Sequence, residues 1–249
     1  MHREGGELLE DVPRAALRTG HGLVGAANEL VEMRLALHAR VLVDRHVPSV
    51  LSEPVERWRG TVLEGRIVRL EPLSAEHEEG LWLASRDART WRWLSVVQPR
   101  TRDEWTGWMR QALEAAEAGT EIPFVTIRQE AIVGSTRFLA LRPEHRSLEI
   151  GWTWLHPSAW GTGAYAEAKL LQLRYAFDTL GCRRVELKTD ALNERARAAL
   201  EGIGATFEGI HRKHMLVRDG ESRDSAWYSI LDDEWPAARA HLERRLAAT

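Results

Sequence analysis

The sequence predicts an α+β fold in which one mixed, mostly antiparallel central sheet is flanked by helices. Two observations carry this prediction. Segments with alternating apolar and polar residues, typical of strands, are interspersed with segments of helical periodicity. The order of these segments is strand, two helices, three strands, helix, strand, helix, two strands and a final helix, which describes a mixed layer around a single sheet.

The individual elements follow from local signals. The helix over 101–118 has the clearest start, because Thr101 can cap it and Glu104 stands three positions later, as in a capping box. Gly204 is a typical helix stop, and Asp219-Gly220 is a hairpin signal. In chain order we expect a strand over 62–70, helices over 74–85 and 101–118, strands over 123–128, 131–141 and 147–155, a helix over 163–180, a strand over 184–189, a helix over 193–203, strands over 205–217 and 225–231, and a helix over 232–246.

Residues 1–57 differ in composition from the rest and are predicted to be an N-terminal extension, helical or partly disordered, in front of a domain over 58–249. Residues 14–40 are rich in Ala, Leu, Glu and Arg, as helices are, but glycines interrupt the early part. The alternative is that the segment arises from a start codon upstream of the natural one. Apolar residues recur at helical spacing at Leu30, Met33, Leu37 and Val41.

Composition and charge argue against several function classes. The formal net charge is -3 with both signs interspersed, so we expect no nucleic-acid partner. No apolar run approaches the ~20 residues of a membrane helix, and residues 1–11 lack the apolar core of a secretory signal. No Cys/His spacing supports a metal site. The lone Cys182 excludes an intramolecular disulfide and fits a reducing compartment, so we expect a cytoplasmic protein.

The clearest chemical signal lies over 149–168, where a strand gives way to a helix. Pro157 stops strand pairing, and Gly161 and Gly163 follow directly before the helix. Glycines let backbone N–H groups converge without Cβ clashes, and the helix start adds unpaired donors and a positive dipole end. Such a turn suits a pyrophosphate or another anion. The alternative is a simple tight turn; a Walker loop is excluded, because no Gly-Lys-Ser/Thr follows.

This segment contains Glu149-Ile150-Gly151-Trp152, then His156-Pro157, and then Trp160-Gly161-Thr162-Gly163-Ala164-Tyr165-Ala166-Glu167-Ala168. It resembles the acyl-CoA-binding motif of the GNAT acetyltransferase superfamily, in particular its Rim-type branch of ribosomal-protein N-acetyltransferases. The likeness covers roughly residues 60–235, and it implies a GNAT-like fold. Two positions depart from the family pattern: Ser158, where Arg or Gln is frequent, and Ala196, where Ser is frequent.

The resemblance implies that acetyl-CoA is the co-substrate. Backbone amides from Trp160 to Ala164 would hold its pyrophosphate, and residues 155–157 would lie beside the pantetheine arm. Asn193 would hydrogen-bond the pantetheine region, although Asn is also favoured as a helix N-cap and can fill both roles. The cofactor-binding candidates are Leu155, His156, Pro157, Trp160, Gly161, Thr162, Gly163, Ala164 and Asn193.

Two side chains are candidates for the proton transfers of acyl transfer to an amine. The attacking amine must be neutral, so a base takes its proton; Glu149, on the strand before the turn, is the candidate. Tyr228, on a late strand, is the candidate acid. The alternatives are an ordinary salt bridge for Glu149 and a core position for Tyr228. His156 is expected to be structural, and the basic run from His211 to His214 is expected to divide between the two faces of a strand.

Together these observations predict an N-acetyltransferase that moves an acetyl group from acetyl-CoA to a primary amine by direct attack in a ternary complex. The acceptor is a protein N-terminus or a small-molecule amine, and a homodimer is possible. The alternative is a non-catalytic acyl-CoA-binding regulatory or interaction module. Turnover with any amine would separate the two.

Overall fold

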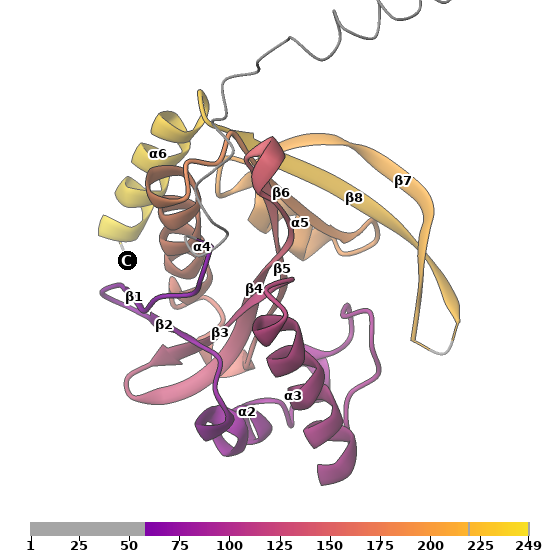
Figure 1. Cartoon of the computed structure of the whole chain (residues 1–249). Helices are drawn as coiled ribbons and strands as arrows, with labels where there is room; N and C mark the ends of the chain where they lie inside the picture. The colour runs from indigo at the N-terminus through magenta and orange to yellow at the C-terminus, as the bar shows by residue number, and fades with distance from the viewer. Residues whose placement is uncertain (1–57, 219, 249) are drawn as a thin grey trace, which may run out of the picture. The chain divides into compact units, whose positions relative to one another are not determined.

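The central sheet has eight strands in the order β1-β2-β3-β4-β5-β6-β8-β7 (Figure 1). The computed structural model describes residues 58–218 and 220–248, so the predicted N-terminal extension and Asp219 lie outside the described residues. The elements are β1 (Leu63–Glu64), β2 (Arg69–Pro72), α2 (Glu78–Ala84), α3 (Arg102–Glu117), β3 (Ile122–Arg128), β4 (Ala131–Arg142), β5 (Ser147–Leu155), α4 (Ala164–Arg174), β6 (Arg184–Asp190), α5 (Glu194–Glu201), β7 (Thr206–Val217), β8 (Glu221–Leu231) and α6 (Trp235–Ala247).

The predicted fold class is confirmed. All neighbouring strands pair antiparallel except β5 and β6, which pair parallel. The predicted capping box of α3 is present, because the Thr101 hydroxyl accepts from the Glu104 amide and the Glu104 carboxylate accepts from the Thr101 amide. The single strand expected over 62–70 is wrong. It divides into β1 and β2, because the chain turns after Gly65, whose amide donates to the Val68 carbonyl.

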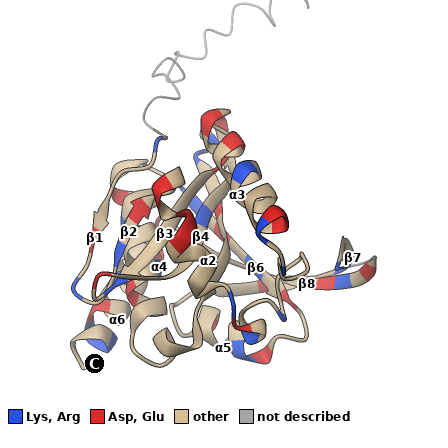
Figure 2. Cartoon of the chain, turned by 90° about the horizontal axis from the view of Figure 1, so that it is seen from below, with Lys and Arg blue, Asp and Glu red and all other residues tan. Residues whose placement is uncertain are grey.

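Helices cover both faces of the sheet. Figure 2 shows α4, α5 and α6 on one side of the strands and α3 on the other. The larger core packs side chains of the first group against the sheet, including Leu173 of α4 and Leu242 of α6. The smaller core holds α2 and α3 against the opposite face, and it is rich in tryptophan: Trp105 and Trp108 stack with their ring centroids 4.9 Å apart. We call these the α4 face and the α3 face.

A buried lysine on α4 has no carboxylate partner among the described residues. Lys169, on α4, is 1% exposed, and its Nζ atom bonds the Thr153 hydroxyl at 2.6 Å and the Gln172 side-chain oxygen at 3.0 Å. Burial lowers the pKa of Lys169 to about 7. Between about pH 7 and the ordinary lysine pKa, the Lys169 side chain is therefore protonated in the unfolded chain and neutral in the folded chain.

We expect Lys169→Met to raise the free energy of unfolding by about 1–4 kcal/mol at pH 7, because it removes the cost of burying a charge. In the wild type this cost is fully present below pH 7 and declines as the pH rises toward the unfolded pKa, so stability increases with pH by up to about 1.4 kcal/mol per unit. Urea unfolding at pH 7 and 9 measures both effects. The exposed Lys213→Met is the control; an equal pH slope in Lys169→Met and the wild type would contradict the account.

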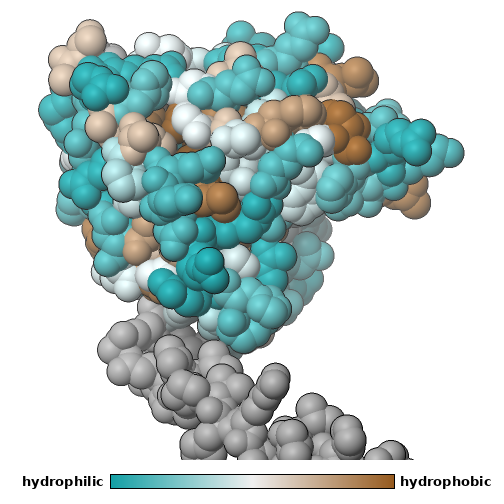
Figure 3. All heavy atoms as spheres, turned by 90° about the horizontal axis from the view of Figure 1, so that it is seen from above, coloured by the Kyte–Doolittle hydropathy of each residue, from teal (hydrophilic) through white to brown (hydrophobic). Residues whose placement is uncertain are grey.

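The surface seen in Figure 3 is mostly hydrophilic, with apolar residues in small groups. Exposed large apolar side chains include Leu192 at 77% and Leu216 at 74%. Within the described part of the chain, no helix combines the length and apolar character needed to cross a membrane.

Candidate functional site

The sheet opens between β5 and β6. These strands pair over only three positions, from Ser147 opposite Arg184 to Glu149 opposite Glu186. Both strands continue beyond this point, β5 to Leu155 and β6 further along its pairing with β8. The facing edges of the two strands therefore carry backbone donors and acceptors that no neighbouring strand pairs.

A bulge lies in β5 just beyond the end of its pairing with β6. Trp154 pairs with Ser135 of β4 and Gly151 pairs with Arg137, so two residues of β5 oppose one residue of β4. Trp152, inside the bulge, has φ +51°, a left-handed conformation that is rare for a bulky side chain. Bulges of this kind increase local bending and twist. The opening is thus built into the backbone of β5.

The turn after β5 lies at this opening. His156 caps a short 3-10 helix over Pro157–Ala159, because its Nδ1 atom accepts from the Ser158 amide at 3.2 Å and lies 2.8 Å from the Ser158 hydroxyl. Gly161 has φ +75° and Gly163, the N-cap of α4, has φ +83°. Both values fall in the left-handed region that glycine adopts without strain. His156 thus has a structural contact, and its predicted place beside the ligand stays a prediction.

The turn leaves a run of backbone donors free. Within residues 58–218 and 220–248, the amides from Gly161 to Ala166 have no hydrogen-bond acceptor, whereas the Glu167 amide donates to the Gly163 carbonyl at 2.9 Å. The Trp160 amide donates to the Pro157 carbonyl at 3.0 Å, so the free run begins one residue later than predicted. A helix alone leaves about four free N–H groups. The two glycines extend that set, next to the positive end of the α4 dipole.

Positive side chains flank the turn. The guanidinium of Arg195, near the start of α5, lies 4.1 Å from the Trp160 ring centroid, and that of Arg89 lies 5.6 Å from it. Both arginines are exposed. Arg89 is already paired with the Asp87 carboxylate at 2.9 and 2.7 Å. Free amides, a helix N-terminus and the Arg195 cation together make this turn attractive to a phosphorylated ligand.

A buried carboxylate fixes the first turn of α4. Glu167, 6% exposed, accepts hydrogen bonds from the backbone amides of Arg66, Ile67 and Val68 at 3.0, 2.5 and 2.6 Å. A Cβ atom on Gly65 would lie 2.5 Å from the Glu167 carboxylate, so this position requires glycine. Glu167 of the sequence motif therefore ties the start of α4 to the β1–β2 turn and makes no contact with the free amides.

We expect Glu167→Ala to lower the free energy of unfolding by about 3–5 kcal/mol, because three backbone donors lose their acceptor in a buried place. Urea unfolding of the purified variant measures the loss. Glu243→Ala, which removes an exposed ion-pair partner on α6, should cost less than about 1 kcal/mol. Equal costs for the two variants would contradict the role given to Glu167.

Glu149 lies where the pairing of β5 and β6 ends. The residue is 3% exposed, and its Oε2 atom accepts a hydrogen bond from the Lys188 Nζ atom at 2.5 Å. Burial raises the pKa of Glu149, and the Lys188 ammonium opposes this rise. The salt bridge that the sequence analysis gave as the alternative role of Glu149 is therefore present. A carboxylate with a raised pKa at the end of strand pairing also suits a proton acceptor.

Tyr228 lies on the other face of the sheet. It is fully buried in the core that faces α4, and its hydroxyl accepts from Arg197 Nε at 3.1 Å and donates to Glu201 at 3.3 Å. Its β6 partner is Leu187, whereas Lys188, which bonds Glu149, pairs with Trp227. Adjacent strand residues point to opposite faces. The structure thus does not bring the two candidate catalytic side chains together.

The remaining candidates lie around the opening. The Asn193 side-chain oxygen caps α5 by accepting from the Ala196 amide at 3.1 Å. The side-chain nitrogen, Nδ2, makes no hydrogen bond within the described part of the chain. Leu155 is buried in the larger core, and its carbonyl accepts from the Trp160 indole at 2.9 Å. The Thr162 hydroxyl donates to the Ala159 carbonyl at 2.8 Å. The N-cap role of Asn193 leaves its –NH2 group available to a ligand.

A second bulge brings the two histidines of the basic run to Trp227, the ring that the Lys188 ammonium also contacts. Three residues of β7, between His211 and Met215, oppose Asp224 alone on β8. The expected division of the basic run is therefore wrong at its ends: the rings of His211 and His214 lie 5.7 Å apart, and both contact Trp227. Strict alternation predicts opposite faces, and only the bulge brings the two rings together.

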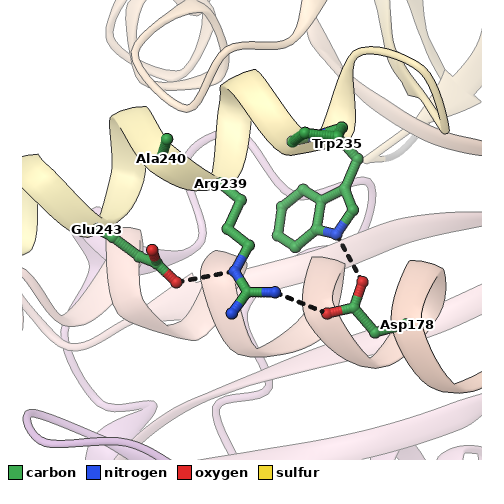
Figure 4. Close-up of a pocket in the computed structure, with 6 residues that line it drawn as sticks. Asp178, Trp235, Arg239, Ala240 and Glu243 are labelled. Carbon is green, nitrogen blue, oxygen red and sulfur yellow. Dashed lines mark hydrogen bonds and ion pairs between the residues drawn. The ribbon is translucent and has the colours of Figure 1, made fainter.

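A hollow on α6 lies away from this turn. Figure 4 shows Arg239 between Glu243 and Asp178, with the Trp235 indole donating to Asp178 at 2.8 Å. Arg239 lies 2.9 Å from Glu243 and 3.2 Å from Asp178. Because these charged groups already pair with one another, the hollow offers no free charged group to a ligand.

Comparison with known proteins gives a consistent result. Residues 68–206 match the family described as acetyltransferase (GNAT) domain. YdaF of Bacillus subtilis, provisionally named a ribosomal N-acetyltransferase, is 30% identical over 174 residues, covering 67% of this chain and 90% of YdaF. FsC-acetyl coenzyme A-N(2)-transacetylase of Aspergillus fumigatus is 29% identical, covering 68% of this chain and 75% of its own length. The crystal structure of a GCN5-related N-acetyltransferase from Brucella melitensis is 35% identical, with a TM-score of 0.69 over 74% of this chain and 84% of its own.

Proposed function

Because the chain belongs to the GNAT acetyltransferase family and is an acetyl-CoA-dependent N-acetyltransferase, we propose how its described residues carry out that reaction. The observation that supports the proposal most strongly is the run of free amides from Gly161 to Ala166 beside the opening of the sheet. We propose that these amides bind the pyrophosphate of acetyl-CoA. The exposed Arg195 adds positive charge at the same turn.

The pantetheine arm is proposed to enter between β5 and β6. It carries two amide groups, and unpaired strand edges bind amides as they bind another strand. Beyond Glu149 on β5 and Glu186 on β6, the facing edges of the two strands do not pair with each other. The free –NH2 group of Asn193 lies at the end of the same β6 strand and is proposed to donate to the arm. This arrangement directs the thioester toward Glu149, where the strands meet.

The proposed chemistry is direct attack. The amine nitrogen bonds to the thioester carbonyl carbon, the carbon–sulfur bond breaks, and the coenzyme leaves as a thiolate. Glu149 takes the proton that the amine gives up, either directly or through water. Tyr228 is proposed to supply the proton to sulfur from the α4 face.

The acceptor is proposed to be a primary amine on a protein N-terminus or a small molecule, in the cytoplasm. A thiol-release assay with acetyl-CoA and a panel of N-terminal peptides and small amines tests this. We expect thiol release that depends on both substrates, together with a mass increase of the amine by one acetyl group. Tight binding of CoA without turnover of any amine would favour the alternative, a non-catalytic acyl-CoA-binding module.

A further inference from the structure

We propose that Lys188 is a positioning residue that holds the Glu149 carboxylate charged and directed at the opening between β5 and β6. This inference rests on the proposed role of Glu149 as the base. Lys188 stands two residues beyond Glu186, the last β6 residue that pairs with β5. Its ammonium therefore reaches from the free part of β6 back to β5, and the ion pair joins the two strands where their backbone hydrogen bonds stop.

The Lys188 side chain is itself supported from β8. Lys188 pairs with Trp227 across the strands, and its Nζ atom lies 5.0 Å from the Trp227 ring centroid. The His211 ring stacks on Trp227 with centroids 4.8 Å apart. An ammonium over an indole face is stabilised by the ring quadrupole. These contacts hold the ammonium in place on the α3 face with its partner carboxylate.

Other charged groups around the pair act on Glu149 less directly. Glu186 of β6 raises the pKa of Glu149, and Arg142 of β4 lowers it. Both effects on this pKa are smaller than those of burial and of Lys188. Arg142 is already bonded to Glu186. Arg223 of β8 interacts with Glu149 electrostatically, and the charge of Lys188 lowers the pKa of His214 of β7. Among the described residues, Lys188 alone bonds the Glu149 carboxylate directly, so its removal exposes the effect of burial.

The closing experiment compares Lys188→Met and Lys188→Arg with the wild type. NMR titration of the Glu149 side-chain carboxyl carbon, assigned with Glu149→Gln, reports its protonation without any turnover. We expect the midpoint to rise by about one pH unit or more in Lys188→Met, because an opposite charge at bonding distance is lost. In Lys188→Arg, which keeps the charge, it should stay within a few tenths of a unit.

Kinetics give the second readout. The acidic limb of the kcat/KM profile should move to higher pH in Lys188→Met by the same amount as the NMR midpoint. In Lys188→Arg the limb should stay where the wild type has it. A midpoint in Lys188→Met equal to that of the wild type would overturn the inference. A shifted midpoint in a protein whose limb does not move would instead show that Lys188 charges Glu149 but that Glu149 is not the base, which refutes the proposed function separately.

Discussion

Gly161→Glu is expected to weaken CoA binding by about 100-fold or more in a calorimetric titration. Gly161 is exposed, and a Cβ atom there would meet no heavy atom within 4 Å, so the side chain fits without a clash. The new carboxylate would stand among the free amides that run from Gly161 to Ala166. It would repel the pyrophosphate and compete for the same N–H donors. The effect is therefore on the ligand, with little effect on the fold.

The matched control is Gly119→Glu. Gly119 has φ +69°, close to the +75° of Gly161, and a Cβ atom there is equally unobstructed. Both substitutions thus impose the same left-handed strain on a non-glycine residue, but Gly119 follows α3, far along the chain from the turn. We expect Gly119→Glu to bind CoA as the wild type does. Unchanged affinity in Gly161→Glu would contradict the assignment of the turn.

Glu149→Gln is expected to reduce kcat by about 10²–10⁴-fold while leaving the affinity for CoA unchanged. The amide has the shape of the carboxylate but takes no proton from the amine. Since burial raises the pKa of Glu149, the wild-type kcat/KM should fall as the pH drops through a value above the ordinary 4.5 of glutamate. The variant should lose this acidic limb. Steady-state thiol release across the pH range measures both effects.

Glu121→Gln provides a control for the loss of a buried ion pair. The Glu121 carboxylate accepts from Arg137 at 2.8 Å, and the Arg137 side chain is 6% exposed. Arg137 pairs with Gly151 of β5, two residues from Glu149, but neither Glu121 nor Arg137 bonds Glu149. We expect wild-type kcat in Glu121→Gln. If kcat fell by a comparable factor in both variants, the effect of Glu149→Gln would come from weakened packing, and the argument that Glu149 is the base would fail.

The sequence predicts most of the fold, because its signals are local. The capping box at Thr101 and Glu104 and the glycines at Gly161 and Gly163 each act within a few residues, and the structure has the predicted features at these places. The separation of β1 from β2 was harder to predict. The turn between them depends on Glu167, about a hundred residues away in the chain, whose carboxylate binds three amides of that turn.

The side-chain partners at the site were less predictable for the same reason. Lys188 meets Glu149 only because β5 and β6 pair parallel for three positions and then separate. His211 and His214 meet only because β7 carries three residues against Asp224 of β8. Bulges change which face a side chain takes, and no residue type in these segments announces one. One signal in the sequence was available. Glu186 and Lys188 stand two residues apart on β6, so they share one face of the strand, and this places a cation on the face of Glu149.

The most direct test of the central claim is an amide NMR titration of the ¹⁵N-labelled protein with CoA. We expect the largest changes in chemical shift at the backbone amides from Gly161 to Ala166, which have no hydrogen-bond acceptor among the described residues. The Trp160 amide, bonded to the Pro157 carbonyl, should change less, and Gly119 should not change. Saturable CoA binding that leaves the amides from Gly161 to Ala166 unshifted would contradict the account.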